Sequence, residues 1–234
     1  MDLTEFLVVI PARKGSKGIP GKNHKDFNGK PLFQYTLDFA LKNFASHQIY
    51  VSTNDEIIQE LAENCGIDVP ILRSDVLSTD QTGMQAVLLD VIEKQEAIGK
   101  QYQGIILLQP TSPFRRSEDL EAMSLLFDPS VDMVVSVCRS KENPYFNLFE
   151  LSEKGFLFKS KEGNHSTRQE APQVFAFNGS MYFIQVKSLK EKSISCFDKI
   201  KMFEMTQEFS IDLDEPIDWE FAEFLLKNKK VHVD

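Results

Sequence analysis

The chain has 234 residues, 42% of them hydrophobic and 26% charged, the ordinary composition of a globular protein with a substantial buried core. A formal net charge of −9 argues against a nucleic-acid-binding face, and no apolar run approaches the length of a membrane span. Three widely spaced cysteines without a CxxC pair argue against a disulfide framework or a thiolate zinc site. Because an apolar strand begins almost at the N-terminus, we expect no signal peptide, and hence a cytoplasmic protein with neither nucleic-acid nor membrane partners.

The first predicted strand, residues 6–10, is a short apolar run that stops at Pro11. Such runs bounded by breakers are typical of buried parallel strands. The loop at 11–23 then carries three glycines, two prolines, four cations and Ser16. Glycines let several N–H groups point at one place, and cations beside them suit a polyphosphate. The loop is not a Walker motif, because Ser16 replaces a required glycine and Asn23 replaces the Ser or Thr that holds magnesium. A solvated basic loop is the alternative.

Strands and helices then alternate as far as residue 137. Apolar spacing predicts helices at 32–43, 55–65, 82–95 and 117–127, and strands at 49–51, 69–72, 105–108 and 133–137. This alternation predicts one α/β domain over 1–234, with a Rossmann-like, doubly wound and mostly parallel sheet. Ligands bind such sheets beyond the carboxyl ends of the strands. We therefore expect the site to be built from the loops at 11–23, 52–54, 73–82 and 109–116.

The alternation stops after residue 137. Residues 139–180 hold several aromatic side chains, and a turn at 153–155 separates two short Phe/Leu runs. We interpret this range as a small antiparallel β excursion that covers the site or makes a dimer contact. A strand at 182–184, a strand near 201–205 and an amphipathic helix at 216–226 complete the chain.

Three later clusters carry chemistry. Gln109 follows a buried strand and begins a rigid proline-bounded turn. Arg168 and Asn178 lie near a glycine turn, a weak signal by itself. Asp212 and Asp214 alternate in an extended segment, so both carboxylates face one side and can share a hard cation such as Mg²⁺. Alternatively, Asp214 caps the last helix and Asp212 is a solvated acid.

Together these motifs resemble those of the acylneuraminate cytidylyltransferases, in register along essentially the whole chain. The matching segments are Ile-Pro-Ala-Arg-Lys-Gly-Ser-Lys at 10–17, Gly-Lys-Asn at 21–23, Leu-Gln-Pro-Thr-Ser-Pro at 108–113, Arg-Gln at 168–169, Asn-Gly at 178–179 and Ile-Asp-Leu-Asp at 211–214. The resemblance implies that CTP activates a nine-carbon 2-keto-3-deoxy acidic sugar, giving a CMP-sugar and pyrophosphate. It also implies a homodimer whose excursion reaches the partner's site, and a Mg²⁺ or Mn²⁺ cofactor.

The resemblance also implies a role for each matched residue. The residues implied to bind CTP are Arg13, Ser16, Lys22, Asn23, Arg73 and Thr82. Those implied to bind the sugar are Gln109, Arg168, Asn178 and Tyr182. Asp212 and Asp214 match the metal pair, and with Arg13 and Lys22 they form the implied catalytic set.

One segment departs from the family pattern. Bacterial sialic-acid members carry a lysine shortly after a proline in the excursion, whereas this chain has Asn-Pro-Tyr-Phe-Asn at 143–147. The departure favours a more apolar or differently acylated sugar, of legionaminic or pseudaminic type, as an alternative to N-acetylneuraminate. The motifs are also compatible with a Kdo-type or other nucleotide-sugar enzyme, and with a non-catalytic nucleotide- or sugar-binding protein on the same fold.

Overall fold

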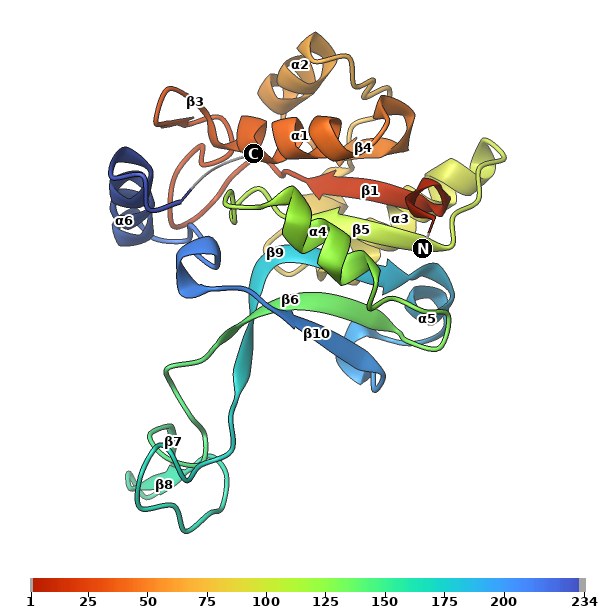
Figure 1. Cartoon of the computed structure of the whole chain (residues 1–234). Helices are drawn as coiled ribbons and strands as arrows, with labels where there is room; N and C mark the ends of the chain where they lie inside the picture. The colour runs from red at the N-terminus through yellow and green to blue at the C-terminus, as the bar shows by residue number, and fades with distance from the viewer. Residues whose placement is uncertain (1, 232–234) are drawn as a thin grey trace.

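The computed structural model describes residues 2–231 and is built on a six-stranded sheet in the order β10-β6-β9-β5-β1-β4 (Figure 1). The strands are β1 (Phe6–Pro11), β4 (Ile49–Ser52), β5 (Gly104–Leu108), β6 (Met133–Arg139), β9 (Phe175–Gln185) and β10 (Ile200–Glu204). β1 pairs in parallel with β4 and β5, and β10 in parallel with β6. β9 runs antiparallel between β5 and β6. The predicted Rossmann-like, mostly parallel architecture is confirmed.

Helices cover both faces of this sheet. They are α1 (Leu32–Asn43), α2 (Glu56–Asn64), α3 (Met84–Ala97), α4 (Ser117–Ser124), α5 (Val186–Glu191) and α6 (Pro216–Lys227). Because side chains alternate along a strand, Val8 and Ile10 of β1 pack toward α1, α2 and α4, whereas Leu7 and Val9 pack toward α3 and α5. α6 belongs to a third cluster, built on Phe27 of the small hairpin β2 (Asp26–Phe27)–β3 (Lys30–Pro31). No helix within 2–231 is long and apolar enough to cross a membrane.

The predicted strand at 69–72 is wrong. This segment runs from α2 back toward the sheet edge without pairing, and Pro70 offers no N–H for a ladder. Val69 is buried, but the side-chain amide of Gln59 donates to its carbonyl at 3.0 Å. Ile71 is 56% exposed. The apolar run at 69–72 therefore contains one buried side chain, that of Val69, and forms no strand.

The excursion stands away from the body of the molecule (Figure 1). It contains the predicted hairpin, formed by β7 (Phe149–Leu151) and β8 (Leu157–Lys159), with Gly155 at φ +79° in the turn. Residues 175–180 of the predicted range lie in β9. The glycine turn expected after Asn178 is instead an irregularity inside this strand: Gly179 has φ +72°, and the pairing register with β6 shifts between Val135 and Val137.

Gly104 leaves room on β5 for the aromatic ring of Phe6. Phe6, its partner on β1, lies so near that a Cβ on Gly104 would come 2.3 Å from the Phe6 ring. That ring is fully buried and makes edge contacts with Phe127 and Phe183, at 5.1 and 6.0 Å between ring centroids.

We therefore expect Gly104→Ala to lower the free energy of unfolding by about 1–3 kcal/mol, because a packed ring must move. Urea unfolding followed by circular dichroism measures this value. Gly83→Ala is the matched control, since a Cβ there meets no atom within 4 Å; its effect should stay below about 1 kcal/mol. Equal losses in the two variants would contradict the packing explanation.

Candidate active site

A cleft of about 550 Å³ opens beyond the carboxyl ends of the parallel strands β1 and β5. The loop at 11–23 forms one wall, and Gln109, Pro110 and Thr111 after β5 form another. Of the residues predicted from the sequence, the cleft brings together Arg13, Ser16, Lys22, Asn23, Arg73, Gln109 and Asp214. The position agrees with the rule that open α/β sheets bind ligands at this edge.

The loop at 11–23 is shaped by its glycines and by backbone anchors. Gly15 and Gly21 have φ values of +83° and +65°, a region that residues with a Cβ rarely adopt. At Gly18 the constraint is contact: a Cβ there would lie 2.0 Å from the carbonyl oxygen of Asp214. Asn23 donates its side-chain amide to the Arg13 carbonyl at 3.2 Å, which closes the loop on itself. The loop can therefore lie directly on the acidic segment.

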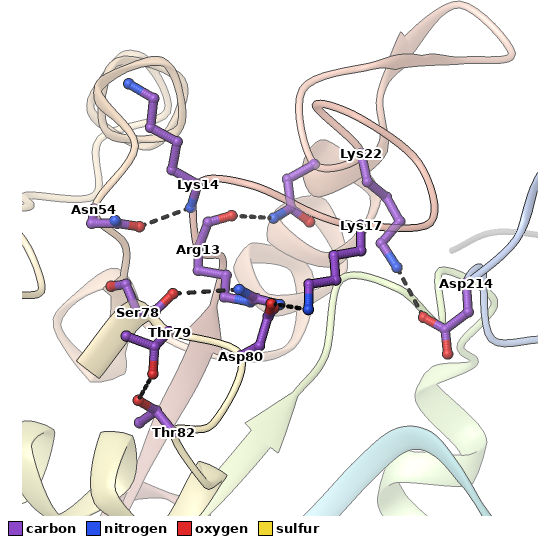
Figure 2. A network of polar contacts seen from close by, with 11 residues as sticks. Arg13, Lys14, Lys17, Lys22, Asn54, Ser78, Thr79, Asp80, Thr82 and Asp214 are labelled. Atoms are coloured by element: carbon purple, nitrogen blue, oxygen red, sulfur yellow. Dashed lines mark hydrogen bonds and ion pairs between the residues drawn. The ribbon is translucent and has the colours of Figure 1, made fainter. Parts of the chain in front are cut away.

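Three cations of this loop, Arg13, Lys17 and Lys22, have carboxylate partners (Figure 2). Arg13 pairs with Asp80 at 2.5 Å and donates to the Ser78 carbonyl at 3.3 Å. Lys17 pairs with the other oxygen of Asp80 at 2.6 Å. Lys22 is 7% exposed, and its Nζ donates to the Leu213 carbonyl at 2.6 Å and to Asp214 at 3.0 Å. The cleft thus concentrates positive charge and balances it with carboxylates on neighbouring segments.

Arg73 is the one cleft cation, among residues 2–231, with a buried donor left unpaired. Its backbone N–H donates to the Thr53 carbonyl at 2.7 Å and its Nε to the Ser78 hydroxyl at 3.1 Å, whereas Nη2 has no partner. Burial, with the nearby charge of Arg13, lowers the pKa of Arg73 to about 10, so the guanidinium remains charged at neutral pH. A buried unpaired donor is costly, and an acceptor on a ligand would satisfy it.

Thr82 does not line the cleft. Its hydroxyl forms a hydrogen bond with that of Thr79 at 2.8 Å (Figure 2). It also donates to the Val76 carbonyl at 2.9 Å. These bonds hold the turn that carries Asp80. Thr82 therefore stabilises the 73–82 loop by hydrogen bonds inside the loop.

The acidic segment is fixed between the turn after β5 and α6. The buried Leu213 donates its N–H to the Thr111 carbonyl at 2.8 Å. Asp212 accepts a hydrogen bond from the Thr111 side chain; burial raises the pKa of Asp212, and the charge of Asp214 raises it further. Part of the Asp212 side chain nevertheless reaches solvent. The alternative in which Asp214 caps α6 is wrong, because Glu215 is the N-cap residue.

Asp212 and Asp214 have the donor chemistry that Mg²⁺ or Mn²⁺ requires. Within residues 2–231 no group of three or more His, Cys, Asp or Glu side chains could hold a metal ion. A metal held by this pair would thus take its other ligands from water and substrate phosphates, the usual arrangement for Mg²⁺. The neighbouring cationic loop offers a place for those phosphates, so the residues fit the metal.

β9 lies against Gln109 and Asp212, beside the cleft. Gly179 comes so close that a Cβ would lie 2.8 Å from the Ser112 hydroxyl, 3.3 Å from Gln109 Oε1 and 3.4 Å from Asp212 Oδ2. Only a glycine lets the strand bring these oxygens together. Tyr182 lies three residues after Gly179 on β9 and is partly buried, and this burial raises the pKa of its hydroxyl to about 12.

Asn178 is 3% exposed, and its amide bonds inside the protein. Its Oδ1 accepts from the Ser136 hydroxyl at 2.6 Å, and its Nδ2 donates to the Ser210 hydroxyl at 3.0 Å. Asn178 thereby ties β9 to β6 and to the segment before Asp212.

Arg168 lies in the excursion and not in the cleft. It donates to the Lys141 carbonyl and lines a small cavity of about 80 Å³ together with Arg139 and Pro172. Within one chain it is therefore separated from the other predicted sugar residues.

Sequence reasoning gave no role to Asp80 or Arg115. Arg115 is fully buried; it donates to the Ser180 carbonyl at 3.1 Å, the Thr36 hydroxyl at 2.8 Å and the Gln109 carbonyl at 2.5 Å. Its place at the end of the proline-bounded turn was the only signal in the sequence. The partners of such a residue come from segments that a sequence does not show to be neighbours.

Comparison with known proteins agrees with this geometry. A family model described as cytidylyltransferase matches residues 7–232. The chain is 33% identical to a CMP-N,N'-diacetyllegionaminic acid synthase of Legionella pneumophila, over 95% of this chain and 96% of that protein. It is 29% identical to a pseudaminic acid cytidylyltransferase of Campylobacter jejuni, over 94% and 96%.

A solved structure of a CMP:2-keto-3-deoxy-manno-octonic acid synthetase complexed with CTP has the same fold. It matches with a TM-score of 0.69 at 20% identity, covering 96% of this chain and 99% of that one. The resemblance noted from the motifs is thus confirmed over nearly the whole sequence. The chain belongs to the cytidylyltransferase family.

Proposed function

We propose that this protein transfers the cytidylyl group of CTP to a nine-carbon 2-keto-3-deoxy acidic sugar in the cytoplasm, releasing pyrophosphate. The observation that carries the proposal is the contact of Lys22 with Leu213 and Asp214, which holds the cationic glycine loop of the cleft against the segment that carries Asp212 and Asp214. Phosphoryl transfer needs mainly such positioning and charge neutralisation. Relatives named for legionaminic and pseudaminic acids support the class of sugar.

In this reaction the anomeric oxygen of the sugar attacks the α-phosphorus of CTP, and the bond from that phosphorus to the bridging oxygen of pyrophosphate breaks. Arg13, Ser16, Lys22 and Asn23 line the cleft where the triphosphate would lie. The unpaired Nη2 of Arg73 suits an acceptor on the cytosine edge. A base is thereby held at one end of the cleft and phosphates at the other.

Bound Mg²⁺ or Mn²⁺ would neutralise charge on the phosphates and orient the α-phosphate. Asp212 and Asp214 would hold it. Thr111 orients the Asp212 carboxylate by its hydrogen bond, and Lys22 holds Asp214 at 3.0 Å on the cleft side of α6.

The sugar would bind beside Gln109 and Tyr182, next to the reacting phosphate. Its carboxylate suits Arg168, whose planar guanidinium can donate to both oxygens. Since Arg168 lies in the excursion, we propose a homodimer in which each excursion reaches the partner's cleft. Exposed apolar side chains on and beside its hairpin support such a contact; they are Leu148, Phe149, Leu151, Phe156, Leu157 and Phe158.

The residues at 143–147 bear on the identity of the sugar. Asn143 is buried and donates to the Pro172 carbonyl at 2.9 Å, so it is a structural residue. Tyr145 packs edge-on against His165, with ring centroids 6.0 Å apart. The Lys161 ammonium lies 5.3 Å from the centre of the Tyr145 ring, so this surface presents an aromatic face together with a cation.

The test of this function is pyrophosphate release from CTP with a panel of N-acetylneuraminate, legionaminic, pseudaminic and Kdo acids. We expect turnover with nine-carbon acids and the highest kcat/KM with a legionaminic- or pseudaminic-type sugar. Turnover with Kdo alone would contradict the assignment, as would turnover with none of the four.

Asp212→Ala should lower metal-dependent pyrophosphate release by about 100- to 1,000-fold, because the metal loses a ligand near the charge that develops. The fold should remain, which thermal unfolding checks. Asp68→Asn is the matched control, an exposed acid outside the cleft, and should keep full turnover. Unchanged turnover in Asp212→Ala would remove the metal assignment.

The dimer proposal makes a complementation prediction. Lys22→Ala and Arg168→Ala should each be nearly inactive alone, because one damages the CTP side and the other the sugar side. If Arg168 serves the partner's cleft, mixed dimers contain one intact site, and a refolded equimolar mixture should recover about a quarter of wild-type activity. No recovery, with mixed dimers demonstrated by differential tagging, would place Arg168 in its own chain's site or in none.

A further inference from the structure

Asp80 carries a carboxylate that lies among the cations of the loop at 11–23, called the phosphate loop from here on. One oxygen lies 2.5 Å from Arg13 Nη2 and the other 2.6 Å from Lys17 Nζ (Figure 2). All three residues line the cleft. Neither the resemblance nor the transfer mechanism above gives Asp80 a role.

The carboxylate is held in this position from both sides. The turn that carries it is closed by the hydroxyls of Thr79 and Thr82. The hydrogen bonds from Lys17 and Arg13 keep the pKa of Asp80 below its usual value, so the group is anionic at neutral pH. Two oxygens that bridge two cations imitate the contacts of a phosphate group.

The geometry points to a role for Asp80 as the resident anion of the phosphate site, an inference that rests on the proposed function. Before CTP binds, Asp80 holds Arg13 and Lys17 toward the cleft. During turnover it competes with pyrophosphate for the same two cations and so favours product release. Asp80 is thus a positioning residue that touches neither the base nor the sugar.

Exchange of this kind requires weak ion pairs, and the exposure of the side chains agrees. Those of Arg13 and Asp80 are 37% and 39% exposed, and that of Lys17 is 82% exposed. Ion pairs open to water contribute little and break easily. A polyphosphate offers more anionic oxygens than one carboxylate and can displace it.

The test is isothermal titration of inorganic pyrophosphate into the full chain in the presence of EDTA, with wild type and Asp80→Asn compared. Removing the competitor should tighten pyrophosphate binding about three- to tenfold. Asp80→Glu keeps the charge and should remain near wild type.

Asp75→Asn is the matched control, because it removes the same charge from the same loop. Its carboxylate accepts from the Asn54 amide at 3.3 Å and does not line the cleft. We expect its affinity to change less than about twofold, since the charge is screened by solvent.

Three outcomes would overturn the inference while leaving the proposed function standing: unchanged binding in Asp80→Asn, weaker binding in it, or an equal gain in Asp75→Asn. Absence of pyrophosphate binding in every variant, wild type included, would overturn the inference as well, whereas the proposed function is decided separately by metal-dependent pyrophosphate release from CTP.

Discussion

The contact of Lys22 with residues 213 and 214 holds the cationic loop at 11–23 against the acidic segment. It joins parts of the chain 191 residues apart, through a lysine that is 7% exposed. Burying an ammonium is costly unless its donors are satisfied, and here a carbonyl and a carboxylate satisfy two of them. Gly18 makes the contact sterically possible, because its Cα faces the Asp214 carbonyl with no room for a methyl group.

The packing of α6 determines where the acidic segment lies. Trp219 of α6 contacts Phe27 edge-on with ring centroids 5.0 Å apart, and Phe27 belongs to the hairpin that follows the phosphate loop. The same aromatic cluster therefore supports both the loop at 11–23 and the acidic segment. Functional geometry at this edge rests on a core separate from the two that sandwich the sheet.

Local patterns in the sequence were sufficient to predict most elements and the loops that meet in the cleft. Periodicity and breakers report whether a short segment is buried, and this was correct for β1, β5 and α6. Periodicity does not report strand direction, so it left open that β9 would run antiparallel between β5 and β6. It also predicted a strand at 69–72, because Val-Pro-Ile-Leu is an apolar run; in the structure only Val69 of this run is buried.

The contacts between side chains from distant segments also could not be predicted from the sequence. Lys22 and Asp214 were each chosen from their own loops, but nothing in either segment indicates their 3.0 Å contact. Asn178 was chosen for the sugar, whereas its amide is bonded to Ser136 and Ser210. Asp80 went unnoticed because an acid in a polar loop is ordinary until its neighbours are known.

The burial of Arg115 has a consequence for the order in which the site is assembled during folding. Its guanidinium is satisfied only when α1, β9 and the turn after β5 are all in place, since each supplies one of its acceptors. Until then a charged group would be buried without partners, which penalises partly folded states in which the turn is set but β9 is absent. The sheet edge that carries Gln109 therefore forms together with the insertion of β9, as one cooperative unit.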